Sequence, residues 1–189
     1  ATCGSARGSR MTLTIQMATS ASNASRPRPT DAETSTDTAA QMPADATPTA
    51  ALPYVAMAGS SDLYEIESSR LAIQRAPTPA VKQFAQMMID HHTMTTQQVM
   101  QAAQAAGLTP PPPTLLPPHR AMVDKLQPLN DAAFERMYLQ QQRVAHRMAL
   151  ALHQNYATDG DTPQLRQVAG TAVPIVQRHI DQLRSLPGS

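Results

Sequence analysis

The sequence contains few aromatic residues and almost no cysteine. Among its 189 residues are two Phe, four Tyr and no Trp, and Cys3 is the single cysteine. A lone cysteine excludes an intrachain disulfide and a Cys-x-x-Cys metal site. Because aromatic side chains are scarce, the core must be built largely from Ala, Leu, Met and Val, which favours closely packed helices over a β-sandwich. The composition therefore predicts an all-α protein.

The chain also lacks an excess of charge and any long apolar run. Its 15 Lys and Arg residues nearly balance 14 Asp and Glu residues, for a formal net charge of +1. A chain with this charge balance has no excess of positive charge with which to bind nucleic acid, and it has no row of aromatic residues on which bases could stack. No stretch reaches the roughly 18 apolar residues that a transmembrane helix needs. Phosphate loops, nucleophile motifs and haem attachment motifs are also missing, so no motif indicates catalysis.

The N-terminal part of the chain is rich in Ser, Thr, Ala and Pro. From Ala18 to Ala51 its only large apolar side chain is Met42, so the segment cannot bury enough surface to offset the entropy cost of ordering. We predict a disordered tether over residues 1–51 and a folded domain over residues 52–187. Cys3 is either a lipidation site, which would anchor the tether to a membrane, or an incidental residue. The short, Thr-rich apolar run near the start is not an intact signal peptide.

Proline and glycine divide the folded part into helices. Proline favours the first turn of a helix and glycine the position after its last turn, and apolar residues recur between these signals with helical spacing. Four long helices are predicted, at residues 52–76, 79–107 and 131–159 and from Pro163 onwards. Consecutive prolines in TPPPPTLLPP (109–118) predict an extended crossover, followed by a short helical segment near 120–126. The sequence predicts a four-helix bundle with a long proline-rich crossover between helices two and three.

One polar residue on each predicted long helix falls at a similar level of this bundle. These residues are Glu65, His91, His146 and His179. Glu65 and His91 lie at nearly equal distances from the first hairpin turn, so an antiparallel pair places them side by side. His146 and His179 flank the second turn at distances that differ by about one helical turn. Imidazole and carboxylate ligands suit zinc and copper, so these four residues are the predicted ligands of a single Zn or Cu ion.

Other interpretations of the histidines stay open at this stage. His92 lies on the apolar seam of its helix and His91 at the inner edge, and only one of the two can point fully inward. A single interior histidine more often satisfies its hydrogen bonds than binds a metal. His119, in the crossover, and His153, near a helix end, are expected at the surface.

Methionine beside these histidines allows a second chemistry. Met87, Met88 and Met94 flank His91 and His92, and thioether with imidazole suits Cu(I). Methionine is also an ordinary filler of cores that are poor in aromatic residues. A ferritin-type di-iron site requires Glu-x-x-His on two helices. The sequence contains no Glu-x-x-His, so such a site is not expected.

Four segments together resemble a known family. They are EIESSRLA (65–72), FAQMMIDHH (84–92), FERMYLQQQRVAH (134–146) and VPIVQRHI (173–180). In this order they are similar to the ferritin-like bacterial proteins grouped as domain-of-unknown-function family 4142, over about residues 53–186. The resemblance implies an exported four-helix bundle, in the periplasm or cell envelope, of uncharacterised activity. Phe134-Glu135 departs from the Phe-Asp that is usual in that family.

Three functions follow from these observations. The leading hypothesis is a non-catalytic, exported bundle that binds a metal ion in its interior. One alternative is a metal-dependent enzyme of redox or metal-detoxifying type, and another is a purely structural envelope bundle whose interior histidines only form hydrogen bonds. The sequence identifies no protein partner.

Overall fold

All regular secondary structure that the computed structural model describes, in residues 47–186, is helical. Five helices occur there: α1 Ala51–Arg75, α2 Pro79–Ala105, α3 Pro117–Leu126, α4 Asp131–Asp159 and α5 Pro163–Leu183. The all-α class is confirmed. The four long helices and the short helical segment expected near 120–126 are all present, the latter as α3, so these residues form five helices and not a bundle of four alone. Most of the predicted tether, residues 1–46, lies outside the described residues.

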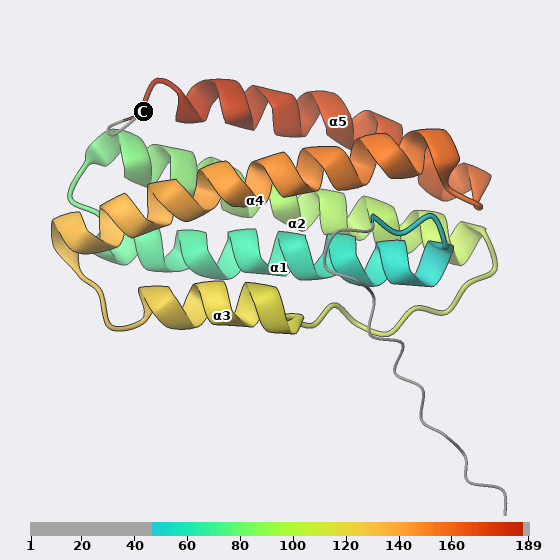
Figure 1. Ribbon diagram of the computed structural model, residues 1–189, viewed down its shortest axis with the longest axis horizontal. Helices are drawn as coiled ribbons and strands as arrows, with labels where there is room; N and C mark the ends of the chain where they lie inside the picture. The colour runs from blue at the N-terminus through green and yellow to red at the C-terminus, as the bar shows by residue number, and fades with distance from the viewer. Residues whose placement is uncertain (1–46, 187–189) are drawn as a thin grey trace, which may run out of the picture. The chain divides into compact units, whose positions relative to one another are not determined.

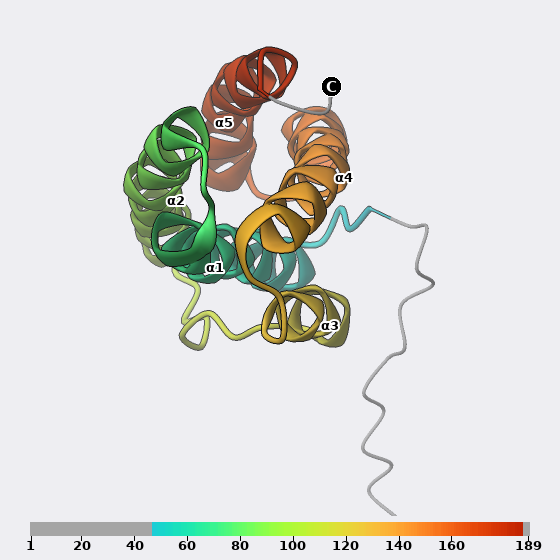
Figure 2. The same cartoon turned by 90° about the vertical axis from the view of Figure 1, so that its left-hand side faces the viewer.

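The four long helices form a closed ring, and α3 lies outside it. Two helical hairpins, α1 with α2 and α4 with α5, contact each other through α1 with α4 and through α2 with α5. Figure 1 shows these helices running alongside one another, and the end-on view in Figure 2 shows α3 against α1 and α4. No helix within residues 47–186 is long and apolar enough to cross a membrane.

The helix boundaries follow the proline signals in the sequence. Pro79 and Pro163 occupy the first turns of α2 and α5, where the missing N–H costs no hydrogen bond. Thr78 precedes α2 in an extended conformation, and its backbone N–H and hydroxyl donate to the carboxylate of Glu135 over 2.9 and 2.7 Å. A residue of α4 thus caps the start of α2. Pro174 lies inside α5.

The interior contains two large apolar clusters with a polar layer between them, and a third, small cluster that includes Tyr64 and Val123. One cluster lies at the junction of α1 and α2 and includes Phe84, Met88 and Phe134. The other lies at the junction of α4 and α5 and includes Tyr54 and Leu165. Along each of the four long helices the positions between these clusters are buried polar residues, among them Asp62, Glu65, His92, Gln142, His146 and His179. Apolar packing at both ends therefore encloses a polar centre.

Polar contacts fix the crossover and α3 to α1. Ser60 of α1 accepts a hydrogen bond from the Leu116 N–H over 2.8 Å, and its hydroxyl lies 2.6 Å from His119 Nδ1. A Cβ atom at Gly59 would lie 3.1 Å from Pro113 Cβ, so the crossover approaches α1 closely at a glycine. The prediction that His119 is a surface residue is wrong, since the docking of α3 leaves it 8% exposed.

Candidate metal centre

Three of the four predicted ligands lie in the polar layer, and the fourth lies at its edge. Glu65 of α1, His146 of α4 and His179 of α5 are each 1% exposed. His91 of α2 is only partly buried, whereas its neighbour His92 is 4% exposed. The two differ because adjacent residues of a helix diverge by about 100°. The structure therefore brings His92, His146 and His179 together and leaves His91 between the interior and the surface.

The sequence itself indicates that His92 faces the interior. His92 lies four residues after Met88 and three before Thr95, and both are buried on the inner side of α2. This is the spacing of an inward-facing helical stripe. The alignment of Glu65 with His91 across the hairpin is the weaker signal. This alignment determines how far along the bundle axis the two residues lie, but not the direction in which their side chains point.

Three histidines form a hydrogen-bonded chain that starts at a backbone carbonyl. The carbonyl oxygen of Gln142 can only accept, so His146 donates to it from Nδ1 over 2.9 Å. His146 Nε2 is then an acceptor, to which His179 Nδ1 donates over 3.2 Å. His179 Nε2 in turn accepts from His91 Nδ1 over 2.7 Å. These bonds assign the tautomers of the three neutral rings.

His92 is held by a carboxylate instead. Its Nδ1 lies 2.7 Å from Asp62 Oδ1, and the hydroxyls of Thr95 and Thr96 both donate to Asp62 Oδ2 over 3.0 Å. The other ring nitrogen, His92 Nε2, is buried and has no hydrogen-bond partner among the described residues. A carboxylate that orients an imidazole through one nitrogen and leaves the other available is the usual support of a metal-ligating histidine.

Glu65 places a buried carboxylate beside the histidines. Its Oε1 lies 3.5 Å from His146 Nδ1, which is long for a hydrogen bond, so the contact is mainly electrostatic. Its Oε2 has no partner in the described part of the chain. Burial raises the pKa of Glu65 to about 7, although the charge of His92 and a hydrogen bond from Gln142 oppose the rise. Near neutral pH this carboxyl group is therefore only partly ionised, and a cation bound beside it would favour the ionised form.

Burial also determines the protonation of the imidazoles. It lowers the pKa of His146 to about 3 and that of His179 to about 2, and the charge of His92 adds to both shifts. For His92 burial acts in the same direction, but the hydrogen bond and charge of Asp62 and the charge of Glu65 outweigh it and raise the pKa. Metals bind the neutral form of imidazole. Both rings are thus in the neutral form that an ion requires, although binding would break the hydrogen bond between them. A proton on His92 would be released as an ion binds.

The three inner histidines fit a transition-metal ion. Each of His92, His146 and His179 offers a nitrogen, and these atoms lie within 4.8 Å of one another. Two nitrogens bound to one ion at about 2.0–2.1 Å are at most about 4.1 Å apart, so shifts of less than about 1 Å would bring them to bonding distance. The unpartnered His92 Nε2 and Glu65 Oε2 are donor atoms that no described residue uses.

The sequence also placed His153 wrongly. It was expected at the surface but is 5% exposed, because the start of α1 covers this end of α4. Its Nδ1 lies 3.0 Å from the hydroxyl oxygen of Tyr54, whose ring stacks on Tyr156 with centroids 3.8 Å apart. Burial lowers the pKa of His153 to about 4. This histidine belongs to the apolar cluster at that end of the bundle and not to the three that converge.

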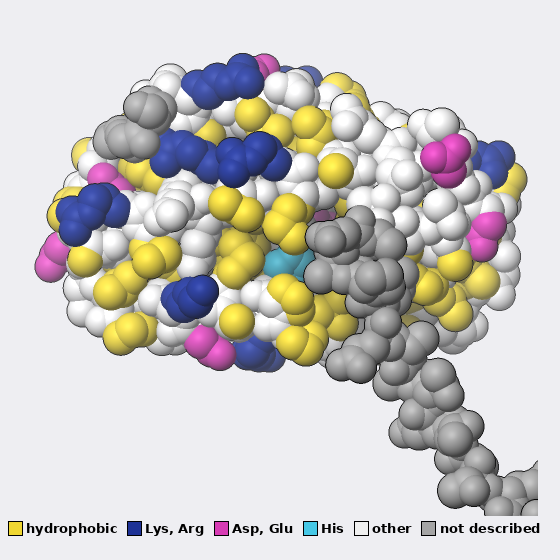
Figure 3. Space-filling view, in the orientation of Figure 1, with side chains coloured by type: hydrophobic (Ala, Val, Ile, Leu, Met, Phe, Trp, Pro, Cys, Tyr) yellow, Lys and Arg dark blue, Asp and Glu magenta, His cyan; other side chains and the backbone are white. Residues whose placement is uncertain are grey.

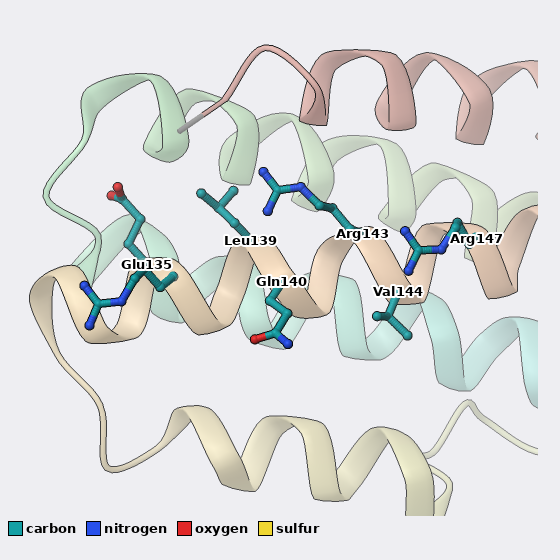
Figure 4. A pocket seen from close by; sticks show the side chains of 7 residues that line it. Glu135, Leu139, Gln140, Arg143, Val144 and Arg147 are labelled. Atoms are coloured by element: carbon teal, nitrogen blue, oxygen red, sulfur yellow. The ribbon is translucent and has the colours of Figure 1, made fainter. Parts of the chain in front are cut away.

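A surface hollow of about 640 Å³ on α4 is separate from the histidines. Figure 3 shows Lys and Arg side chains gathered on this face of the molecule. In Figure 4, Leu139 and Arg143 project from α4 towards α5, Glu135 projects towards the start of α2, and Gln140 and Val144 project to the other side. The residues that line the hollow include no histidine. The candidate metal centre is therefore an interior site and not this surface hollow.

The sequence matches the family described as Domain of unknown function (DUF4142) over residues 33–186. The chain belongs to this family. The resemblance found from the four sequence segments is thereby confirmed. The match starts within the predicted tether, at a position outside the described residues of this DUF4142 protein. No curated protein matches the sequence.

Solved structures of CopM share the fold of this DUF4142 protein. CopM in the Cu(II)-bound form has a TM-score of 0.61 and 19% sequence identity, and the match covers 72% of this chain and 94% of CopM. CopM in the Ag-bound form has a TM-score of 0.59 and 18% identity, covering 72% of this chain and 93% of the other. CopM in the Cu(I)-bound form gives 0.60 and 18%, covering 71% and 93%. At this identity the likeness concerns the fold alone.

Proposed function

We propose that this DUF4142 protein binds a single copper ion in the interior of the bundle. His92, His146 and His179 are the ligands, and Glu65 lies beside them as a fourth donor. The observation that carries the proposal is the convergence of three buried imidazoles, one of which has an unpartnered ring nitrogen. His91 supports His179 from behind through their 2.7 Å hydrogen bond.

The donor set favours copper and zinc over harder metals. Imidazole nitrogen binds both ions well, and affinity for a given nitrogen site is highest for Cu²⁺ among the first-row divalent metals. The copper-bound and silver-bound structures of CopM support copper as the first candidate, because that protein has a similar fold. Zinc is the second candidate, since three imidazoles and one carboxylate also form a regular tetrahedral zinc site.

The surroundings of the site favour binding over catalysis. The three histidines are at most 4% exposed, and apolar clusters enclose the layer from both ends. An ion held in this way is shielded from substrates and from water. We therefore propose sequestration or transport of the ion and not turnover.

A wholly structural role is the competing function, and one observation favours it. The chain from His91 through His179 and His146 to Gln142 is already hydrogen-bonded without a metal. In such a protein the histidines would only hold α2, α4 and α5 together. The unpartnered Nε2 of His92 is what this alternative leaves unexplained, because an unpaired buried polar atom costs about 1–3 kcal/mol.

We also propose an exported location, in the periplasm or cell envelope, and a ferritin-like relationship for the ring of α1, α2, α4 and α5. Both rest on the family resemblance, and the contacts of the four long helices support the second. The segment 1–51 would act as a tether, bound to a membrane if Cys3 is lipidated. Cell fractionation with an antibody against the folded domain tests the location, since recovery in the cytoplasm alone would contradict it.

Metal titration of untagged, metal-free protein tests the function. We expect one equivalent of Cu²⁺ to bind, with a rise in melting temperature, and His92→Asn or His146→Asn to remove most of the affinity. His119→Asn is the matched control, because His119 is also buried and hydrogen-bonded but lies outside the group of three. Circular dichroism confirms that each variant is folded. If neither Cu²⁺ nor Zn²⁺ binds, or if both site variants bind as well as the control, the structural role is correct.

A further inference from the structure

A metal ion that occupies the interior site must first cross the shell of the bundle. His146 and His179 are each 1% exposed and His92 is 4% exposed. His91 is the member of the hydrogen-bonded chain that is only partly buried. Its ring stacks on that of His179, with centroids 5.0 Å apart and an angle of 14° between the planes. His91 thus forms a direct contact between the surface and an inner ligand, at the seam between α2 and α5.

Two methionines share the face of α2 that carries His91. Met87 lies four residues before His91 and Met94 three residues after it, within one uninterrupted helix, and these spacings place side chains on the same face. Met94 is 41% exposed, which is unusual among the large apolar side chains of residues 47–186. Met94 therefore presents its thioether to solvent, whereas Met87 is partly buried and packs against the apolar cluster that includes Phe84.

Charges of both signs act on His91. Burial lowers the pKa of His91, the charges of His92 and Arg178 lower it further, and the charge of Asp90 raises it. Asp90 is exposed and accepts a hydrogen bond from Gln86 over 3.0 Å. A surface of this kind does not attract hard divalent cations by charge. Metal selectivity at this surface would depend instead on how soft its ligands are, and two thioethers with one imidazole suit Cu(I).

We propose that Met87, His91 and Met94 form a surface capture site for Cu(I), from which the ion passes to His179 and the buried histidines. The inference rests on the proposed function and adds to it the oxidation state in which the ion enters and the route that it takes. Each step exchanges one neutral ligand for another, as an imidazole nitrogen of His179 replaces a sulfur or the nitrogen of His91. The ion stays Cu(I) throughout, so no electron acceptor is needed.

The rate of loading tests the capture site. Metal-free protein is mixed, without oxygen and with a reductant, with the Cu(I) complex of a coloured chelator, and the loss of colour is followed by stopped flow. The double variant Met87→Leu/Met94→Leu should load about tenfold more slowly than the unaltered protein, since the loss of a supporting group typically reduces metal affinity by about 10–100-fold. The final stoichiometry should stay at one. Met148→Leu is the control, because Met148 is 53% exposed on α4.

A second measurement observes the capture site directly. In a His146→Asn variant labelled with ¹³C at the methionine methyl groups, Ag⁺ should shift the NMR signals of Met87 and Met94 and leave that of Met148 in place. Ag⁺ serves as a soft monovalent probe that is stable in air. Equal loading rates for the double variant and the control, or unshifted Met87 and Met94 signals, would overturn the proposal while interior binding stands. Failure of the unaltered protein to take up Cu(I), with the methyl shifts present, would instead contradict the buried site.

Discussion

Acidification of the metal-free protein should destabilise it through histidines that are neutral when folded. Burial holds the pKa of His146 near 3, that of His179 near 2 and that of His153 near 4. In the unfolded chain each ring has an ordinary pKa of about 6.5. Below that value the unfolded state therefore binds more protons than the folded state, and stability falls as the pH falls.

The size of the effect follows from these values. Between pH 7.5 and pH 5 each of the three histidines reduces the free energy of unfolding by about 2 kcal/mol, or about 6 kcal/mol together. Glu65 acts in the opposite direction, because its pKa is raised from 4.5 to about 7, and its protonation in the folded state restores about 2.5 kcal/mol over the same interval. His92, whose pKa is raised, contributes a constant amount below about pH 6.5. For His146, His179, His153 and Glu65 together the loss is about 3–4 kcal/mol, a large part of the 5–15 kcal/mol that is typical of a domain. The lowered pKa values of His91 and His119 act in the same direction as this loss.

Urea unfolding followed by circular dichroism, in a chelating buffer at intervals between pH 7.5 and pH 5, measures this loss. The variant His153→Gln keeps a hydrogen-bonding partner for Tyr54 but cannot titrate, so its net loss should shrink by about 2 kcal/mol. A free energy of unfolding that stays constant over this pH range would refute the reasoning, since it would mean that the three rings are accessible to protons in the folded state.

Three further predictions concern single parts of the protein. Asp62→Asn should weaken copper binding by about 10–100-fold in a calorimetric titration while leaving all ligands in place, because it removes the carboxylate that orients His92. Ser60→Ala should reduce the free energy of urea unfolding by about 1–3 kcal/mol, since it leaves the Leu116 N–H without its acceptor and removes the partner of His119. Deletion of residues 1–46 should shift the melting temperature by less than about 4 °C, because the composition of this segment offers little surface to bury.

The boundaries of the long helices could be predicted from proline and glycine alone. Pro79 and Pro163 mark the starts of α2 and α5, and Asp159-Gly160 marks the end of α4, as the structure has them. These signals are local, since they depend on the backbone of one or two residues. The packing of α3 depends instead on contacts between Ser60 and the crossover, which join residues distant in the chain. No local pattern predicted that contact, and the burial of His119 was missed for this reason.

The sequence predicted the position of the candidate site along the bundle axis, but not which side chains point into it. Glu65, His146 and His179 were found because hairpin geometry aligns positions that lie at similar distances from a turn. Whether His91 or His92 faces the interior depends on how α2 is rotated about its own axis. The stripe of inward-facing residues on α2 includes His92 and not His91. Asp62, which holds His92 through a 2.7 Å contact, was missed because a carboxylate one turn from Glu65 gives no signal of its own until α1 and α2 are packed together.

Anomalous X-ray diffraction at the copper edge, from crystals grown with one equivalent of copper, tests the central claim most directly. We predict a single strong peak between α2, α4 and α5, bonded to nitrogens of His92, His146 and His179 at about 2.0–2.1 Å, with Glu65 adjacent to it. Crystals of the fully folded protein that contain copper only at surface positions, or no copper at all, would contradict the account.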